Sequence, residues 1–144
     1  MGISYEGGIR NMNQIMILSG SASDQKIIDK VTSVLDSANT PYEVHIASAH
    51  REPDKVHELV KQGEKNGIKV FICIAGLSAA LPGVVASKTD LPVIGVPVSS
   101  ALGGLDALLS IAQMPKGVPV AAVGIDNGQN AAHLAMRILH LVNS

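Results

Sequence analysis

The residues best suited to chemistry are Ser48-Ala49-His50-Arg51, which directly follow an apolar run from Tyr42 to Ala47. The run is typical of a buried strand, and the end of such a strand is where an open α/β sheet binds its ligands. Imidazoles titrate near neutral pH and serve as general acids and bases, and a guanidinium offers a fork of donors to phosphate or carboxylate. The alternative is a surface loop in which Arg51 pairs with Glu52 or Asp54. The residues alone leave both interpretations open.

A second candidate is the turn Gly20-Ser21-Ala22-Ser23-Asp24. It precedes an amphipathic helical stripe, and free N–H groups at a helix N-terminus favour an anion such as phosphate. The turn matches neither the dinucleotide fingerprint nor the P-loop. Ser23 or Asp24 could simply cap the helix, or Asp24 could bind ribose hydroxyls.

Alternating strands and helices must position these loops. Apolar runs predict five strands, at residues 14–19, 42–47, 70–75, 92–97 and 118–123, with helical patterns between them, including a short helix at 84–88 and one at 103–113. This order favours right-handed βαβ units and a three-layer αβα sandwich with a parallel sheet. We predict one α/β catalytic domain over residues 14–144, preceded by a disordered N-terminal extension at 1–13.

Composition excludes several classes of protein. The formal charge is −1 and no basic stripe occurs, so we expect no nucleic-acid partner. No apolar stretch is long enough for a membrane helix and no signal-peptide pattern opens the chain, so we expect a soluble, unexported protein. The single cysteine, Cys73, lies in an apolar run, which suits a core residue in a reducing compartment such as the cytoplasm. No set of residues has convincing metal-ligand spacing.

Charge is distributed unevenly along the chain. Of 23 Asp, Glu, Lys and Arg residues, 17 lie in residues 1–69 and six in residues 70–144. So few charges in the second half would leave apolar surface on a monomer, which favours subunit contacts. The alternative is that strands buried on both faces account for these apolar residues.

Six motifs follow one another along residues 14–140: Gly20-Ser21-Ala22-Ser23-Asp24, Ser48-Ala49-His50-Arg51, Ala75-Gly76 with Leu81-Pro82-Gly83, Gly95-Val96-Pro97-Val98, Gln113-Met114-Pro115 and Asn130-Ala131-Ala132. Together they resemble the aminoimidazole ribonucleotide carboxylase family of purine biosynthesis, and most closely its N5-carboxyaminoimidazole ribonucleotide mutase branch. The resemblance implies a flavodoxin-like domain that assembles as a homo-octamer and uses no metal or organic cofactor.

The resemblance also implies a ribonucleotide substrate and a role for each matching residue. A carbamate would lose carbon dioxide in a closed pocket, and carbon dioxide would then add to ring carbon C4. His50 matches the catalytic histidine that moves the C4 proton. The remaining matches are substrate-binding: Ser23, Ser48 and Arg51 at the phosphate, Asp24 at the ribose, Ser21 near the carboxylate, and the backbone of Ala75, Gly76 and Leu81 at the carbon dioxide site.

One position departs from the mutase pattern. Mutases usually have a second histidine at the position of Ala80. The branch that uses free carbon dioxide also lacks this histidine. However, Arg51 and Pro97-Val98 differ from the residues that are usual in that branch. We therefore expect a mutase, with a carboxylase or a catalytically impaired nucleotide-binding homologue as alternatives.

Overall fold

The structure is a computed structural model that describes residues 4–6, 9–11 and 13–144. Its five-stranded sheet is parallel throughout and has the order β4-β3-β5-β6-β7. When these five strands are numbered by their order in the chain, their order across the sheet is 2-1-3-4-5, which is the flavodoxin-like arrangement. The strands are β3 (Ile15–Ser19), β4 (Tyr42–Ile46), β5 (Val70–Ala75), β6 (Val93–Pro97) and β7 (Ala121–Ala122).

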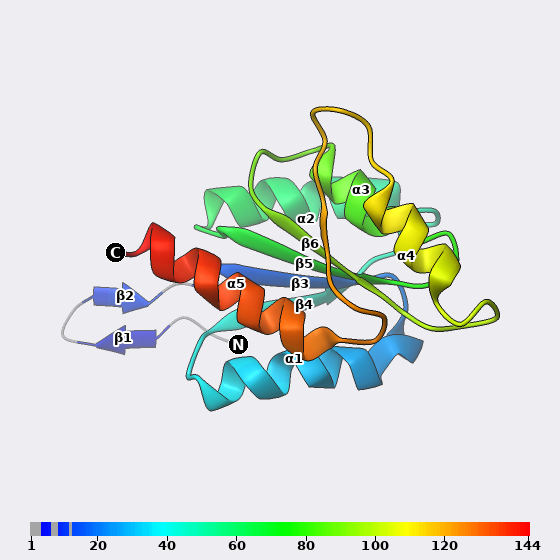
Figure 1. Cartoon of the computed structure of the whole chain (residues 1–144). Helices are drawn as coiled ribbons and strands as arrows, with labels where there is room; N and C mark the ends of the chain where they lie inside the picture. Colours follow the sequence, from blue (N-terminus) through cyan, green and yellow to red (C-terminus); the bar gives the residue numbers. More distant parts are fainter. Residues whose placement is uncertain (1–3, 7–8, 12) are drawn as a thin grey trace.

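Helices cover both faces of this sheet, as Figure 1 shows. One face packs against α1 (Gln25–Ser37) and α5 (Gly128–Val142), and the other against α2 (Pro53–Lys65), α3 (Ala80–Ala86) and α4 (Leu105–Ala112). The predicted three-layer αβα sandwich is therefore confirmed.

The core consists of two apolar clusters, one on each side of the sheet. Side chains alternate along a strand, so β5 supplies Ile72 and Ile74 to one cluster and Phe71 and Cys73 to the other. Every residue of β3, β5 and β6 is buried, as expected for central parallel strands. Burial raises the pKa of the Cys73 thiol, which agrees with the predicted role of Cys73 as a core residue.

Two predicted elements differ from the observed ones. The fifth strand, expected at 118–123, is only the two-residue β7, which pairs with β6 at the edge of the sheet. The short helix expected at 84–88 begins four residues earlier, at Ala80, and ends at Ala86. The early start brings the first turn of α3 to the ends of the strands.

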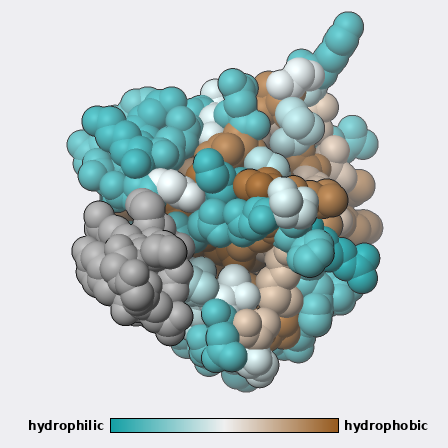
Figure 2. All heavy atoms as spheres, turned by 90° about the vertical axis from the view of Figure 1, so that its left-hand side faces the viewer, coloured by the Kyte–Doolittle hydropathy of each residue, from teal (hydrophilic) through white to brown (hydrophobic). Residues whose placement is uncertain are grey.

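The N-terminal segment contains a short antiparallel pair, β1 (Ser4–Glu6) with β2 (Ile9–Asn11), outside the main sheet. An isolated pair of this kind is marginally stable in water. Residues 1–3, 7–8 and 12 lie outside the described residues, so the disordered extension and the boundary of the catalytic domain at residue 14 stay predictions. Figure 2 shows this side of the molecule, where hydrophilic residues surround a smaller group of hydrophobic ones.

Candidate active site

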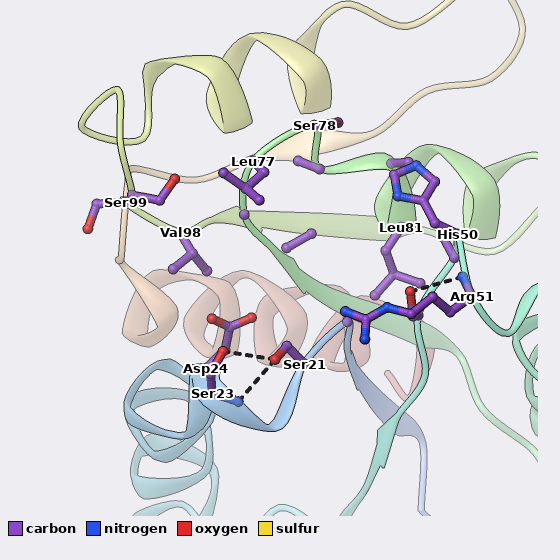
Figure 3. A pocket seen from close by; sticks show the side chains of 18 residues that line it. Ser21, Ser23, Asp24, His50, Arg51, Leu77, Ser78, Leu81, Val98 and Ser99 are labelled. Atoms are coloured by element: carbon purple, nitrogen blue, oxygen red, sulfur yellow. Dashed lines mark hydrogen bonds between the residues drawn. The ribbon is translucent and has the colours of Figure 1, made fainter.

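A cavity of about 480 Å³ opens at the carboxyl ends of the strands. Its walls come from the loops that follow β3, β4, β5 and β6 (Figure 3). The chain passes from β3 to α1 on one face of the sheet and from the neighbouring strand β5 to α3 on the other face, so the loops after these two strands diverge around a crevice. The cavity therefore lies at the topological switch point of the sheet.

The cavity brings together all nine residues that the sequence singled out. They come from three loops that are far apart in the chain: Ser21, Ser23 and Asp24; Ser48, His50 and Arg51; and Ala75, Gly76 and Leu81.

The first loop presents hydroxyl groups on a braced turn. The Ser21 Oγ accepts a hydrogen bond from the Ser23 backbone N–H at 3.1 Å and lies 2.8 Å from the Ser23 Oγ. Beneath them, the fully buried Ser19 hydroxyl donates to the Ser21 carbonyl at 2.9 Å. Asp24 precedes α1 but makes no side-chain capping bond to it. Its carboxylate is thus not engaged in the cap that the sequence suggested as one alternative.

The environment of Asp24 disfavours its charged form. Burial raises the pKa of this carboxyl group, and the carboxylate of Asp126 raises it further, against a smaller lowering from the Ser19 hydroxyl. Carboxyl groups with a perturbed pKa in a cleft are candidate functional groups, and Asp24 is one of them.

The second loop holds two exposed basic side chains. The Ser48 Oγ accepts from the Arg51 backbone N–H at 3.2 Å, which fixes the turn. Glu52 pairs with Lys55, 3.6 Å away, rather than with Arg51. Within the described residues, the side chains of His50 and Arg51 form no ion pair and no hydrogen bond to a neighbour, so both are available to a ligand. The alternative of an Arg51 ion pair with Glu52 or Asp54 is not what the structure has.

The third loop is held in an unusual backbone conformation. Leu77 and Ala79 have φ values of 50° and 44°, in the left-handed region that L residues other than Asn and Asp rarely adopt. Such strain concentrates at functional sites. Ala80, which also lines the cavity, is the first residue of α3 and presents only a methyl group.

A fourth loop, after β6, completes the cavity and was not among the predicted site residues. It contributes Val98, Ser99 and Ser100. Ser99 in turn hydrogen-bonds Asp126, which lies in the loop before α5. Burial alone would raise the pKa of Asp126, but hydrogen bonds from the Ser99 hydroxyl and backbone, together with the nearby Lys30 cation, lower it overall. Two hydroxyl residues after a strand were the available signal for Ser99, whereas no sequence pattern indicated Asp126.

Two kinds of feature are absent from the described part of the chain. No group of three or more His, Cys, Asp or Glu side chains there could hold a metal ion. No helix described in the structure is long and apolar enough to cross a membrane.

The fold and the cavity define a class of protein: a flavodoxin-like α/β protein whose strand-end pocket combines hydroxyl groups, a guanidinium, an imidazole and a carboxylate. Comparison with known proteins identifies the family. The profile of the AIR carboxylase family (AIRC) matches residues 14–144, and the chain belongs to this family.

Individual relatives agree with this assignment. The N5-carboxyaminoimidazole ribonucleotide mutase of Methanocaldococcus jannaschii is 57% identical over 88% of this chain and 79% of that protein. A relative from Methanobrevibacter smithii is 57% identical over 89% of this chain, which spans only 38% of that longer protein. The crystal structure of Treponema denticola PurE superposes with a TM-score of 0.80 at 36% identity, covering 88% of this chain and 80% of that one.

Proposed function

We propose that this chain is an N5-carboxyaminoimidazole ribonucleotide mutase, which moves a carboxyl group from the exocyclic amine of its substrate to C4 of the imidazole. The observation that carries the proposal is the convergence of His50, Arg51, Ser23 and Asp24 on one cavity. The mutase names of the Methanocaldococcus jannaschii and Haemophilus influenzae relatives support it.

Each group has a chemical task in this reaction. Arg51, with the hydroxyls of Ser23 and Ser48, binds the phosphate, because a guanidinium and hydroxyl donors match its oxygens. The Asp24 carboxylate accepts hydrogen bonds from the ribose hydroxyls. Ser21 lies near the migrating carboxylate, and Ala75, Gly76 and Leu81 form the wall against which carbon dioxide is held.

The reaction balances without a further reactant. The N–C bond of the carbamate breaks, which releases carbon dioxide and leaves its electron pair on the amine nitrogen, which takes up a proton. C4 then attacks the carbon dioxide and forms the new C–C bond. His50 donates the proton that the amine nitrogen takes up, as a general acid, and then removes the proton from C4, as a general base, which restores its starting protonation state. Every atom of the substrate is found in the product.

Ala80 favours a second candidate, a carboxylase that takes up free carbon dioxide. The position lines the cavity with a methyl group and adds no second titratable side chain. A nucleotide-binding homologue with impaired turnover is the third possibility that follows from the same residue.

The proposed assembly is a homo-octamer, and the proposed location is the cytoplasm. Support for assembly comes from large apolar side chains that are exposed on the single chain near the β6–α4 loop and α4: Leu77, Leu102, Leu105, Leu109 and Ile125. Both residues of the edge strand β7 are exposed as well. A parallel edge strand is normally covered, so a neighbouring copy would bury both features.

A turnover assay separates these functions. The carbamate nucleotide is supplied without bicarbonate, or aminoimidazole ribonucleotide is supplied with bicarbonate, and the C4-carboxylated product is followed. We expect product from the carbamate alone. Product only from the second mixture would identify a carboxylase, and no product from either would contradict both enzyme assignments.

A further inference from the structure

Asp126 does not line the cavity, but its carboxylate accepts two hydrogen bonds from Ser99, which does. The Ser99 backbone N–H donates to one carboxylate oxygen of Asp126 at 2.8 Å, and the Ser99 hydroxyl donates to the other at 2.6 Å. Ser99 itself lines the cavity. Both donors of Ser99 are therefore directed at the same carboxylate, away from any ligand.

The position of Asp126 is fixed from three directions. Its backbone N–H donates to the Pro97 carbonyl at the end of β6, at 2.8 Å, and its own carbonyl accepts from the Lys30 ammonium on α1, at 3.0 Å. Its φ of 60° is in the left-handed region, which Asp tolerates better than most residues. The adjacent Ile125 packs so closely on Gly104 that a Cβ there would lie 2.5 Å from the Ile125 Cγ2. The carboxylate thus has little freedom to leave Ser99.

This geometry decides what Ser99 can offer to a ligand. A serine hydroxyl has one proton and two lone pairs. With its proton given to Asp126, the hydroxyl presents only lone pairs to the cavity. The same hydrogen bonds contribute to the lowered pKa of Asp126, which keeps the carboxylate charged and unable to return a proton.

We infer that Asp126 is a positioning residue that makes Ser99 an acceptor-only group, and that Ser99 recognises a hydrogen-bond donor on the base of the nucleotide, an exocyclic N–H. The inference rests on the proposed function, because that function supplies a base with an N–H group. It adds a specificity-determining pair to the site.

The location of Ser99 favours the base over the phosphate as its partner. Figure 3 shows Ser99 beside Val98, on the opposite side of the pocket from His50 and Arg51. A phosphate held by Arg51 leaves the far side of the cavity to the rest of the nucleotide. An acceptor backed by a carboxylate would also repel phosphate oxygens, so the pair helps to fix the direction in which the ligand binds.

Two variants test the pair. Asp126→Asn keeps the size of the side chain but replaces one acceptor oxygen with an amide donor, which releases the Ser99 proton. Ser99→Ala removes the acceptor. Asp90→Asn is the matched control, because it removes one exposed charge away from the cavity residues. Calorimetry with the full chain measures binding of aminoimidazole ribonucleotide and of ribose 5-phosphate, which lacks the base.

We expect each variant to bind aminoimidazole ribonucleotide about 3- to 10-fold more weakly, the usual effect of one hydrogen bond, and ribose 5-phosphate as the unmodified chain does. The double variant should lose no more than Ser99→Ala alone, because both changes remove one interaction. A purely structural role would weaken both ligands alike.

Equal losses for the two ligands, additive losses in the double variant, or no loss would each overturn the inference. Failure of the unmodified chain to bind aminoimidazole ribonucleotide would overturn both the inference and the proposed function. Selective loss of binding in a chain without turnover would support the inference and contradict the proposed activity alone.

Discussion

Gly128→Ala is predicted to destabilise the protein at the contact between α1 and α5. A Cβ on Gly128, the first residue of α5, would lie 2.8 Å from the Ile27 carbonyl oxygen. It would also lie 3.0 Å from the Val31 Cγ2 and 3.1 Å from the Lys30 Cβ. The nearest atom belongs to the backbone of a helix, so the contact can be relieved only by moving α1 and α5 apart.

The expected magnitude follows from two opposing effects. Overpacking of this kind costs about 1–3 kcal/mol, whereas replacing Gly by Ala in a helix returns about 0.5–1 kcal/mol by restricting the unfolded chain. We therefore expect the free energy of unfolding to fall by about 1–2 kcal/mol, which for a chain of this size lowers Tm by about 3–6 °C.

Thermal and urea unfolding measure the change, with Gly124→Ala as the control. A Cβ on Gly124 would meet nothing closer than 3.6 Å, and its backbone is not left-handed, so that variant should match or slightly exceed the original stability. Since Lys30 on α1 holds the Asp126 carbonyl, Gly128→Ala should also weaken nucleotide binding. A Gly128→Ala protein as stable as the control would refute the packing argument.

Three further predictions concern the site, the core and the surface. Asp24→Asn should raise Tm at neutral pH, because the raised pKa of Asp24 means that its ionised form destabilises the folded state. The difference in Tm between the variant and the original protein should disappear as the pH falls toward 3.8, the value for an unperturbed Asp, where the carboxyl group is protonated. The same variant should bind nucleotide more weakly. Gly95→Ala should lower the free energy of unfolding by about 1–3 kcal/mol, because its Cβ would lie 2.5 Å from the Ile111 Cγ2. In urea titrations, the double variant with Ile111→Ala should lose less stability than the sum of the two single variants, because the smaller side chain makes room for the new Cβ. Leu105→Glu should shift the assembly to smaller species in light scattering with an unchanged circular dichroism spectrum, since the side chain is 55% exposed on the single chain; an unchanged mass would exclude this face as an interface.

The sequence predicted the sheet and the site because both depend on local patterns. Buried parallel strands appear as continuous apolar runs, and β5 (Val70–Ala75) coincides with its predicted range. The carboxyl ends of such strands share one edge of the sheet, so residues in the loops at 20–24 and 48–51 could be expected to meet. The family resemblance added their individual roles, which stay proposals.

The sequence did not predict features that depend on contacts between distant segments. Asp126 acts on Ser99, 27 residues away, through a hydrogen bond that no periodicity encodes. The predicted fifth strand had the right composition, but within the described residues the strand pairing with β6 covers only Ala121 and Ala122. The α3 start at Ala80 follows a turn in which Leu77 and Ala79 adopt left-handed φ values that their residue types do not favour.

The central claim is that His50 carries the C4 proton in a pocket whose other groups bind the nucleotide. The most direct test measures both turnover of the carbamate nucleotide and binding of aminoimidazole ribonucleotide for His50→Asn. We expect turnover to fall by at least about 10²-fold, as for other general acid–base groups, while binding is retained. Undiminished turnover in His50→Asn would contradict the claim.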